Sequence, residues 1–410
     1  MTGSGDEDLR PPADAWSLLG AEGSTVLGGA ELLRVDLPFA SPVETAVGTH
    51  RHRPVVLVHL TAHRPDGTPV EGWGECAALA DTTYDAEDAD GAFAWLEASL
   101  LPTLLRASDR SGALPPVGGL GGLFDGTDHR LACSAVEMAV ADAHLRAAHR
   151  SMAEQLGVSG MRVPAGAVLG LPRSVGQLAT DLDQLAAAGF ARVKVKVAPG
   201  TEAIIDGAVR PLLGSRLLVQ VDANGTYGDD AADRLAILDD LGLVCIEQPL
   251  GRRDLDGHRR LAAALATPIC LDESLDAPSG VIEAVETGAC SMVCVKPARL
   301  GGIGAALEVI SWCEARGVPW WIGGMFETGF ARGVNRVLAA RPGRSFPGDL
   351  SPPSTYLTED LVQPEPGRID ARSGHLTFPV PAGPGLGSTP DRSLLEPWTV
   401  RRVWVPAPTD

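Results

Sequence analysis

The feature that most constrains the fold is a repeat of apolar strand and helix that begins near residue 163. Seven short apolar runs, several of them rich in β-branched residues, are typical of parallel strands buried on both faces. Helical segments, among them residues 174–188, 229–241 and 301–316, lie between the runs, and one unit takes about 25 residues. Strands are predicted at 163–169, 193–197, 217–222, 243–247, 268–272, 292–296 and 319–323, with a much weaker eighth at 344–349.

Seven or eight such units in a row predict a (β/α) barrel rather than an open sheet. An α+β domain precedes the barrel, with strands near 30–35 and 54–60, a Gly-rich strand end at 72–75, and helices near 86–105 and 129–156. The Pro-rich tail is expected to return to that domain. We therefore expect a flexible extension (1–28), the α+β domain (29–160), the barrel (161–350) and the returning tail (351–410).

Composition excludes several classes of partner. The net charge of −18 argues against nucleic acid and anionic membranes as ligands. No apolar run approaches the roughly 18 residues of a membrane span, and the acidic start lacks the pattern of a secretory signal. Seven scattered cysteines are expected to be free thiols. These observations predict a cytoplasmic protein.

Only three lysines occur in the chain, among 34 basic residues: Lys194, Lys196 and Lys296. All three lie in predicted strands, where a charge needs a partner or a chemical role. Arginine can replace lysine as a surface charge, but it cannot release a proton near neutral pH. The three lysines are therefore candidates for catalysis, and chance survival in a Lys-poor composition is the weaker explanation.

Carboxylates end the three strands that lie between these lysines. Asp222, Glu247 and Asp272 follow one another in equal steps of 25 residues, and barrel enzymes place their chemistry at the carboxyl ends of the strands. Adjacent carboxylates repel one another until a proton or a cation relieves them. Oxygen ligands of this kind suit Mg²⁺, with Mn²⁺ as a substitute. The alternative, a separate salt bridge or helix cap for each carboxylate, does not explain the equal register.

The second and sixth strands lie on opposite sides of an eight-stranded ring, so Lys196 and Lys296 are expected to face each other. This arrangement suits removal of the proton α to a carboxylate, with the cation stabilising the enediolate. One lysine, its pKa lowered by burial and neighbouring cations, would remove the proton, and the other would return it or steady the intermediate. Lys194 points to the same side as Lys196 and is expected to lie near the metal-bound carboxylate and help keep Lys196 neutral.

The K-x-K at 194–196, the Asp/Glu/Asp series and the Val-Lys-Pro at 295–297 resemble the enolase superfamily, in its muconate-lactonising-type subgroup. The runs GGMFETG at 323–329, LDES at 271–274, KPARLGG at 296–302 and GPGLG at 383–387 are similar to the N-succinylamino acid racemase/o-succinylbenzoate synthase family. The resemblance implies an α/β barrel of the modified (β/α)7β TIM type, with an N-terminal α+β capping domain completed by the C-terminal segment. It also implies that Lys196 and Lys296 are the acid/base pair.

Departures from that family lie in the regions that select the substrate. The family's first capping loop tends to read Arg-Thr-Ser-Phe-Gly, whereas residues 44–48 read Glu-Thr-Ala-Val-Gly, and Val168 stands where the family often has Ser. Near 351–357 the family's sequence pattern of Asp, Arg and an aromatic residue is replaced by Ser-Thr-Tyr. For Tyr84, substrate contact and simple packing are equally open. Substrate contacts are predicted from Asn224, Arg299, Gly324, Met325, Phe326, Val168, Val47 and Tyr84.

The predicted function is Mg²⁺-dependent abstraction of the proton α to a carboxylate, as an isomerase or a lyase. Racemisation of an N-acylamino acid, N-succinylamino acid-like, is the first choice. The alternatives are a syn-dehydratase of the o-succinylbenzoate synthase type and a racemase or lyase with a non-standard carboxylate substrate. A Schiff-base aldolase has no need of the three carboxylates. A barrel kept only for binding would be expected to have lost some of these lysines and carboxylates, and all of them are present. The expected partners are a small-molecule carboxylate and further copies in a homo-oligomer.

Two further motifs are given no catalytic role. His50 and His52 alternate with arginines, which favours a basic loop tip near the barrel mouth over a metal site. The Gly-Gly-Ile-Gly at 301–304 resembles a phosphate cradle, but it lacks the dinucleotide-binding context, so close backbone packing is expected there.

Overall fold

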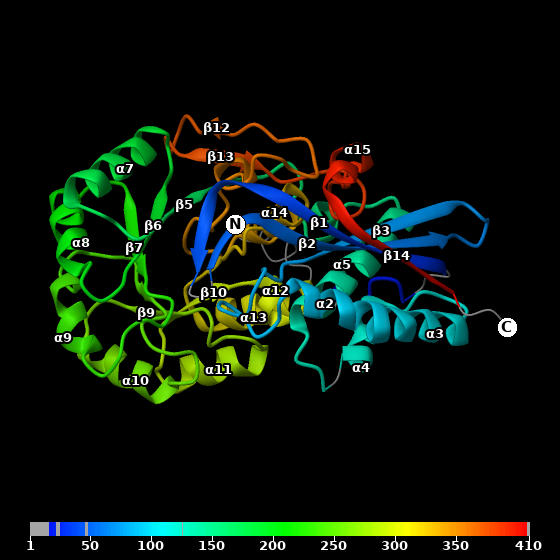
Figure 1. The fold of residues 1–410 in the computed structure, drawn as a ribbon, viewed down its shortest axis with the longest axis horizontal. Coiled ribbons are helices and arrows are strands. Elements are labelled where there is room, and N and C mark those ends of the chain that lie inside the picture. Colours follow the sequence, from blue (N-terminus) through cyan, green and yellow to red (C-terminus); the bar gives the residue numbers. More distant parts are fainter. Residues whose placement is uncertain (1–15, 22–24, 46–47, 125, 408–410) are drawn as a thin grey trace, which may run out of the picture.

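A barrel of parallel strands forms one half of the molecule (Figure 1). The structure, a computed structural model, describes residues 16–21, 25–45, 48–124 and 126–407. Within these residues the barrel sheet has seven strands in the order β11-β10-β9-β8-β7-β6-β5, so neighbours in sequence are neighbours in space. The strands are β5 (Gly166–Leu169), β6 (Arg192–Lys196), β7 (Leu218–Asp222), β8 (Ile246–Glu247), β9 (Ile269–Leu271), β10 (Met292–Val295) and β11 (Trp320–Ile322). All seven strong strands of the prediction are present, mostly shorter than predicted.

The weak eighth strand closes the ring through backbone hydrogen bonds. On one side Ser345 N and Asp349 N each donate to β11, to Trp320 O and Ile322 O at 2.9 Å. On the other side Gly166 N of β5 donates to Gly348 O at 2.8 Å. Residues 344–349 therefore occupy the eighth position of a closed barrel, although their geometry is too irregular to form a regular strand.

Helices surround the barrel on its outer face (Figure 1). The predicted helix at 229–241 is shorter than expected, because it becomes a 3-10 turn at Ala236–Leu238. A short helix, α12 (Pro297–Leu300), directly follows β10 and carries the residues after Lys296. The longer outer helices are α7 (Val175–Ala187), α8 (Glu202–Val209), α9 (Ala231–Leu235), α10 (Leu255–Ala264), α11 (Pro278–Glu286), α13 (Ile303–Arg316) and α14 (Gly329–Ala339).

The capping domain is an antiparallel sheet covered by helices. Its sheet order is β14-β1-β2-β3, from β1 (Val26–Thr45), β2 (Gly48–His63), β3 (Pro69–Cys76) and β14 (Thr399–Pro406). The predicted helix at 86–105 is a continuous run of α2 (Ala89–Trp95), a π-helical turn (Leu96–Leu100) and α3 (Leu101–Ser111). The predicted helix at 129–156 is instead split into α5 (Arg130–Ala147) and α6 (Met152–Gln155), because His149 between them has a φ of 54°.

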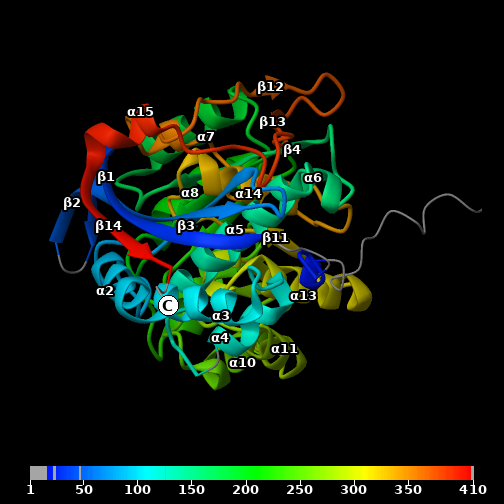
Figure 2. The same ribbon diagram turned by 90° about the vertical axis from the view of Figure 1, so that its right-hand side faces the viewer.

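The C-terminal segment contributes to both halves of the molecule. β14 pairs antiparallel with β1 along the outer edge of the capping sheet (Figure 2). Before it, β12 (Arg368–Ile369) and β13 (Leu376–Pro379) form a small antiparallel sheet with β4 (Arg162–Pro164), the segment that leads into the barrel. The prediction that this segment completes the capping domain is confirmed by the β14–β1 pairing. The domain boundaries remain predictions.

Two glycines of β3 allow the capping sheet to approach α5 closely. A Cβ atom on Gly72 would lie 2.1 Å from Ala139 O, and one on Gly74 would lie 1.8 Å from Ala135 O. Any side chain at either position would collide with the helix backbone. The Gly-Trp-Gly sequence of β3 therefore brings α5, and with it the barrel helices that α5 contacts, against the sheet.

The start of α13 is capped by a carboxylate from α5. Glu137 Oε1 accepts hydrogen bonds from Gly304 N at 2.8 Å and from Trp16 Nε1 at 2.9 Å. A Cβ on Gly302 would collide with Glu137 Oε2, so the expected close packing at 301–304 is present. Trp16 is 1% exposed, so this residue of the N-terminal segment packs into the protein, whereas residues 1–15 and 22–24 lie outside the described part.

Candidate active site

The ends of the barrel strands bring the three lysines and the three carboxylates to one edge of the sheet. Lys196 of β6 pairs in register with Asp222 of β7, and Asp222 pairs with Glu247 of β8. Glu247 pairs with Cys270 of β9, so Asp272 lies two residues further along its strand. This offset is the stagger that a tilted, closed barrel requires. The equal spacing in sequence therefore gives equal register for two carboxylates and an offset for the third.

The two lysines of β6 bind different sets of acceptors. Lys196 Nζ lies 2.7 Å from Asp222 Oδ2 and 2.6 Å from Asn224 Oδ1. Lys194 Nζ lies deeper in the barrel, 3.0 Å from Glu247 Oε1 and 3.3 Å from Asp222 Oδ2. Asp222 is therefore shared between both ammonium groups. Lys194 is 4% exposed, whereas the side chain of Lys196 is 29% exposed, so only Lys196 is open to a bound molecule.

Lys296 is held by one residue of the barrel and one of the capping domain. Its Nζ lies 2.6 Å from Asp272 Oδ2, and it also contacts the Tyr84 hydroxyl. That hydroxyl donates to the same Asp272 Oδ2 at 2.5 Å. The Arg299 guanidinium lies 4.7 Å from the centre of the Tyr84 ring and donates to Asp85 Oδ2 at 2.9 Å. Tyr84 is therefore more than a packing residue, because it connects the capping loop to Lys296.

The electrostatics of the lysines differ from the prediction. Burial lowers the pKa of Lys296, but Asp272 and Tyr84 outweigh burial and raise that pKa well above its usual value. Burial also lowers the pKa of Lys194, and its carboxylate neighbours again raise it well above normal. The predicted lowering of a lysine pKa is therefore wrong for Lys296 in this arrangement, because its closest charged neighbour is a carboxylate rather than a cation.

Glu247 is the strand-end carboxylate that the neighbouring cations compensate least. Burial raises the pKa of Glu247, and Asp222, Asp272 and Asp349 raise it further, so that the opposing effect of Lys194 does not restore its usual value. Burial also raises the pKa of Asp222, yet the ammonium groups of Lys196 and Lys194 bring it below its usual value. A further positive charge would therefore be stabilised beside Glu247.

Oxygen atoms suitable for a metal ion are present at this position. Among the described residues, ligand atoms of Glu247, Asp272 and Cys294 lie within 4.8 Å of one another. Asp222 lies outside this group, and its Oδ2 pairs instead with the two β6 lysines. Asp272 Oδ1 and Glu273 Oε2 are buried and accept no hydrogen bond from any residue of the described ranges. Such hard oxygen donors fit a divalent cation of the Mg²⁺ type.

The predicted substrate residues differ in how exposed they are. Phe326 and Val168 are 37% and 45% exposed. Phe326 adopts a φ of 58°, and its ring makes edge-on contacts with the rings of Phe39 and Tyr356. Val47 lies outside the described residues. Arg299 and Met325 are buried, at 1% and 3% exposure, and Gly324 is half-buried, where a Cβ would lie only 2.7 Å from Arg332 Nη1. Asn224 is exposed and contacts Lys196 and Glu273.

Two acidic residues join the site that sequence reasoning did not select. Asp349 ends the irregular eighth position, where it pairs with Arg192 and its Oδ2 lies 3.1 Å from Lys194 Nζ. Glu273 follows Asp272 directly and accepts a hydrogen bond from Asn224 Nδ2 at 2.8 Å. A carboxylate that ends a strand-like run was the signal for Asp349, but the weakness of that run hid it.

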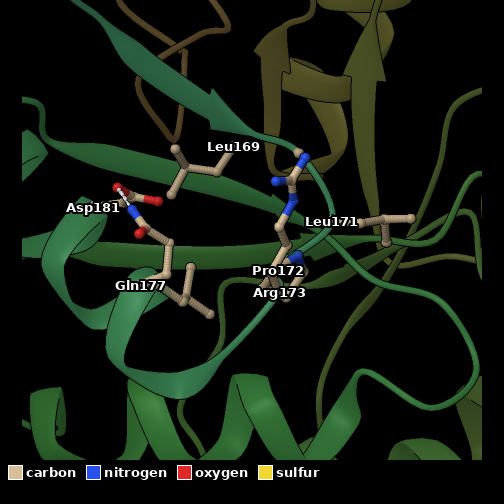
Figure 3. A pocket seen from close by; sticks show the side chains of 8 residues that line it. Leu169, Leu171, Pro172, Arg173, Gln177 and Asp181 are labelled. Atoms are coloured by element: carbon tan, nitrogen blue, oxygen red, sulfur yellow. Dashed lines mark hydrogen bonds between the residues drawn. The ribbon is translucent and has the colours of Figure 1, made fainter. Parts of the chain in front are cut away.

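Two cavities lie near this region. One of about 20 Å³ lies behind Lys296, lined also by Glu75, Glu327 and Asn335. A larger cleft of about 270 Å³ follows β5, and its wall includes Arg173, Gln177 and Asp181. Figure 3 shows its lining side chains, with Gln177 Nε2 donating to Asp181 Oδ1 at 2.7 Å. The three lysines and the strand-end carboxylates take no part in lining this larger cleft.

Comparison with known proteins places the chain in a family. The family model described as "Enolase C-terminal domain-like" matches residues 177–394. An N-succinylamino acid racemase from Amycolatopsis sp is 41% identical over 379 residues, which cover 92% of this chain and 99% of that protein. The chain belongs to the enolase superfamily. Within the superfamily, the o-succinylbenzoate synthase of Geobacillus stearothermophilus is 31% identical, over 90% of this chain and 94% of that protein.

The fold of a solved superfamily member agrees with this assignment. The crystal structure of an enolase superfamily member from Listeria innocua matches with a TM-score of 0.85 at 30% identity, over 94% of this chain and 100% of that chain. The predicted fold, the predicted N-succinylamino acid racemase/o-succinylbenzoate synthase family and the prediction of an isomerase or lyase are confirmed. Across the described residues, every helix is too short or too polar to cross a bilayer.

Proposed function

We propose that the protein removes the proton α to the carboxylate of a small molecule and racemises an N-acylamino acid, N-succinylamino acid-like. The observation that carries this proposal is the placement of Lys196 and Lys296. In a ring of eight positions, β6 and β10 lie four strands apart, which is diametrically opposite. Each lysine is paired with its own carboxylate, so a substrate held between them would present one face to each base.

Asp222, Glu247 and Asp272 are the residues that would hold Mg²⁺, with Mn²⁺ as its substitute. When bound, the cation would accept the substrate carboxylate and stabilise the negative charge that develops on it. The residues themselves must rearrange for this chemistry, because Asp222 and Asp272 now pair with lysine ammonium groups. A carboxylate that turns away from Lys296 removes the main cause of its raised pKa and frees it to act as a base.

Other residues of the site have positioning roles in this proposal. Asn224 holds Lys196 from one side, and its backbone is held in a positive φ of 42°. Tyr84 holds Lys296 from the capping domain, so the loop of residues 79–88 must be in place for that base to be oriented. Lys194, which contacts Glu247 and Asp349, supplies positive charge beneath the substrate carboxylate.

The proposed substrate class rests on similarity to a relative, and exposed apolar side chains indicate which kind of group the substrate carries. A relative that is 41% identical is a racemase of N-succinylamino acids, which supports an N-acylated substrate. Val168, one of the departures from the family, and Phe326 both expose apolar surface, which favours an apolar group on the substrate over a charged one. Syn-dehydration of the o-succinylbenzoate synthase type is the second candidate, and the 31% identity to such a synthase favours it.

The decisive experiment is proton exchange in D₂O, followed by NMR with separate enantiomers of N-acylamino acids and Mg²⁺. Racemisation predicts that Lys196→Ala abolishes exchange of one enantiomer and that Lys296→Ala abolishes exchange of the other. Arg173→Ala, in the separate cleft after β5, is the matched control and should leave exchange unchanged. If the folded, Mg²⁺-loaded protein exchanges no α-proton of any carboxylate tested, the proposed reaction is wrong. If each lysine variant loses α-proton exchange with both enantiomers equally, the result would favour dehydration.

A homo-oligomer in the cytoplasm completes the proposal. Light scattering of the purified protein would test the first part, because a monomer at all concentrations excludes it. Fractionation of the cells that make the protein would test the second part.

A further inference from the structure

Three of the seven cysteines line the interior of the barrel below the carboxylates. Cys245 directly precedes β8, Cys270 lies on β9 and Cys294 lies on β10. All three are buried in one apolar cluster with Met292 and Trp321. All seven cysteines within the described ranges are free thiols. Cys270 Sγ donates to Leu271 O at 3.5 Å. The three thiols therefore share a layer, yet they differ in what surrounds them.

Cys294 is the cysteine that reaches the carboxylates. Of the described residues, Sγ of Cys294 forms a group with ligand atoms of Glu247 and Asp272, all within 4.8 Å. The three residues are 3%, 0% and 1% exposed, so a ligand here would be shielded from water. Gly323 leaves the space for the sulfur, because a Cβ at that position would lie 2.5 Å from it.

Asp272 supplies an independent sign of an unfilled ligand position. Its Oδ2 accepts from Lys296 and Tyr84, whereas its buried Oδ1 accepts no hydrogen bond from the described part of the chain. The ion pair that Oδ1 makes is a long one, with Arg299 Nε at 3.6 Å. A buried carboxylate oxygen without a hydrogen bond is costly, and a cation would satisfy it.

We propose that Cys294, Glu247 and Asp272 bind a thiophilic divalent cation, Zn²⁺ or Cd²⁺, at a site that overlaps the Mg²⁺ site. The inference rests on the proposed function, because Glu247 and Asp272 are also proposed ligands of Mg²⁺. Magnesium prefers oxygen, whereas zinc and cadmium bind thiolate strongly, so the sulfur distinguishes the two classes of ion. A thiophilic cation held by the sulfur would exclude Mg²⁺ from the shared carboxylates and inhibit the enzyme.

The chemistry of binding is a proton exchange without oxidation. A cysteine side chain is ordinarily a thiol near neutral pH, whereas a metal ion binds the thiolate. On binding, the S–H bond breaks, a sulfur–metal bond forms and the proton passes to the solvent buffer. Binding therefore releases the thiol proton.

Titration of the purified full-length protein with Cd²⁺ tests the proposal, because sulfur-to-cadmium charge transfer absorbs in the ultraviolet. The band should saturate at about one Cd²⁺ per chain. Cys294→Ser should lose the band and bind Cd²⁺ at least about tenfold more weakly. Cys270→Ala, in the same layer, and Cys313→Ala, on α13, should keep both.

Three outcomes would overturn the inference: no charge-transfer band in the wild type, a band that persists in Cys294→Ser, or a band lost in Cys270→Ala. Should Cys294→Ser fail to fold, the ¹¹³Cd NMR shift of the wild-type protein reports directly whether sulfur is a ligand. The proposed function is judged separately by D₂O exchange with Mg²⁺. Exchange without a cadmium–sulfur band refutes the thiol site alone, and a band without exchange refutes the proposed reaction alone.

Discussion

Replacement of Glu75 by glutamine is expected to remove a large pH dependence of folding stability. Glu75 lies on β3 of the capping domain and is 1% exposed. Its carboxylate accepts hydrogen bonds from Thr328 N at 3.0 Å and from Thr328 Oγ1 at 2.5 Å, which ties the capping sheet to the loop before α14. Burial raises the pKa of Glu75 to about 7, although Thr328 and Arg53 lower it.

The sign of the effect follows from the raised pKa. The folded protein keeps a proton on Glu75 up to about pH 7, whereas the unfolded chain releases it near pH 4.5. This contribution to stability is complete below pH 4.5 and is lost as the pH rises through 7. The difference between the two pKa values corresponds to roughly 3 kcal/mol, at about 1.4 kcal/mol per pH unit. Glutamine can keep both contacts to Thr328 and has no proton to lose.

Urea unfolding at about pH 5 and about pH 8 measures this contribution. Between the two conditions the wild-type protein should lose roughly 2.5 kcal/mol more of its unfolding free energy than Glu75→Gln does. Glu359→Gln, at an exposed position, is the control and should follow the wild type. An equal loss in the wild type and in Glu75→Gln would show that Glu75 is ionised in the folded protein and would refute the reasoning.

Three further predictions concern the site. Tyr84→Phe keeps the ring beside Arg299 but removes the hydroxyl from Lys296, so D₂O exchange should fall roughly ten- to hundredfold for the enantiomer that Lys296 serves; an equal loss for both enantiomers would contradict this. Asp349→Asn leaves Arg192 and Lys194 without their shared counter-charge, and urea unfolding should show a loss of about 3 kcal/mol. Chelation with EDTA should abolish exchange and Mg²⁺ should restore it, whereas borohydride labelling of a lysine would favour Schiff-base chemistry instead.

The barrel was predictable because its strands are apolar on both faces and end in charged residues. Lys196, Asp222 and Glu247 mark the ends of their strands in the sequence, and the structure places them in direct register. The eighth position escaped a firm prediction because residues 344–349 contain Arg, Ser, Pro and Gly, and backbone hydrogen bonds to two neighbouring strands hold it in place.

The pKa values at the site and the contacts between distant parts of the chain were less predictable. Sequence shows which residues carry charge, but the pKa of Lys296 depends on Asp272 and Tyr84, which come from different elements. Glu137 and Trp16 illustrate the same limit, because the contact between them joins positions 121 residues apart. Tertiary contacts of this length leave no periodicity in the sequence, so a pattern of residue types cannot reveal them.

The pairing of β14 with β1 has a consequence for how the molecule is made. The first long strand of the chain acquires its outer neighbour only when residues 399–406 have been synthesised. Until then the outer edge of β1 exposes backbone donors and acceptors to any other strand. The ribosome therefore releases the whole barrel before the capping sheet can close, and a chain that stops a few residues early would have all three lysines of the barrel but an incomplete capping sheet.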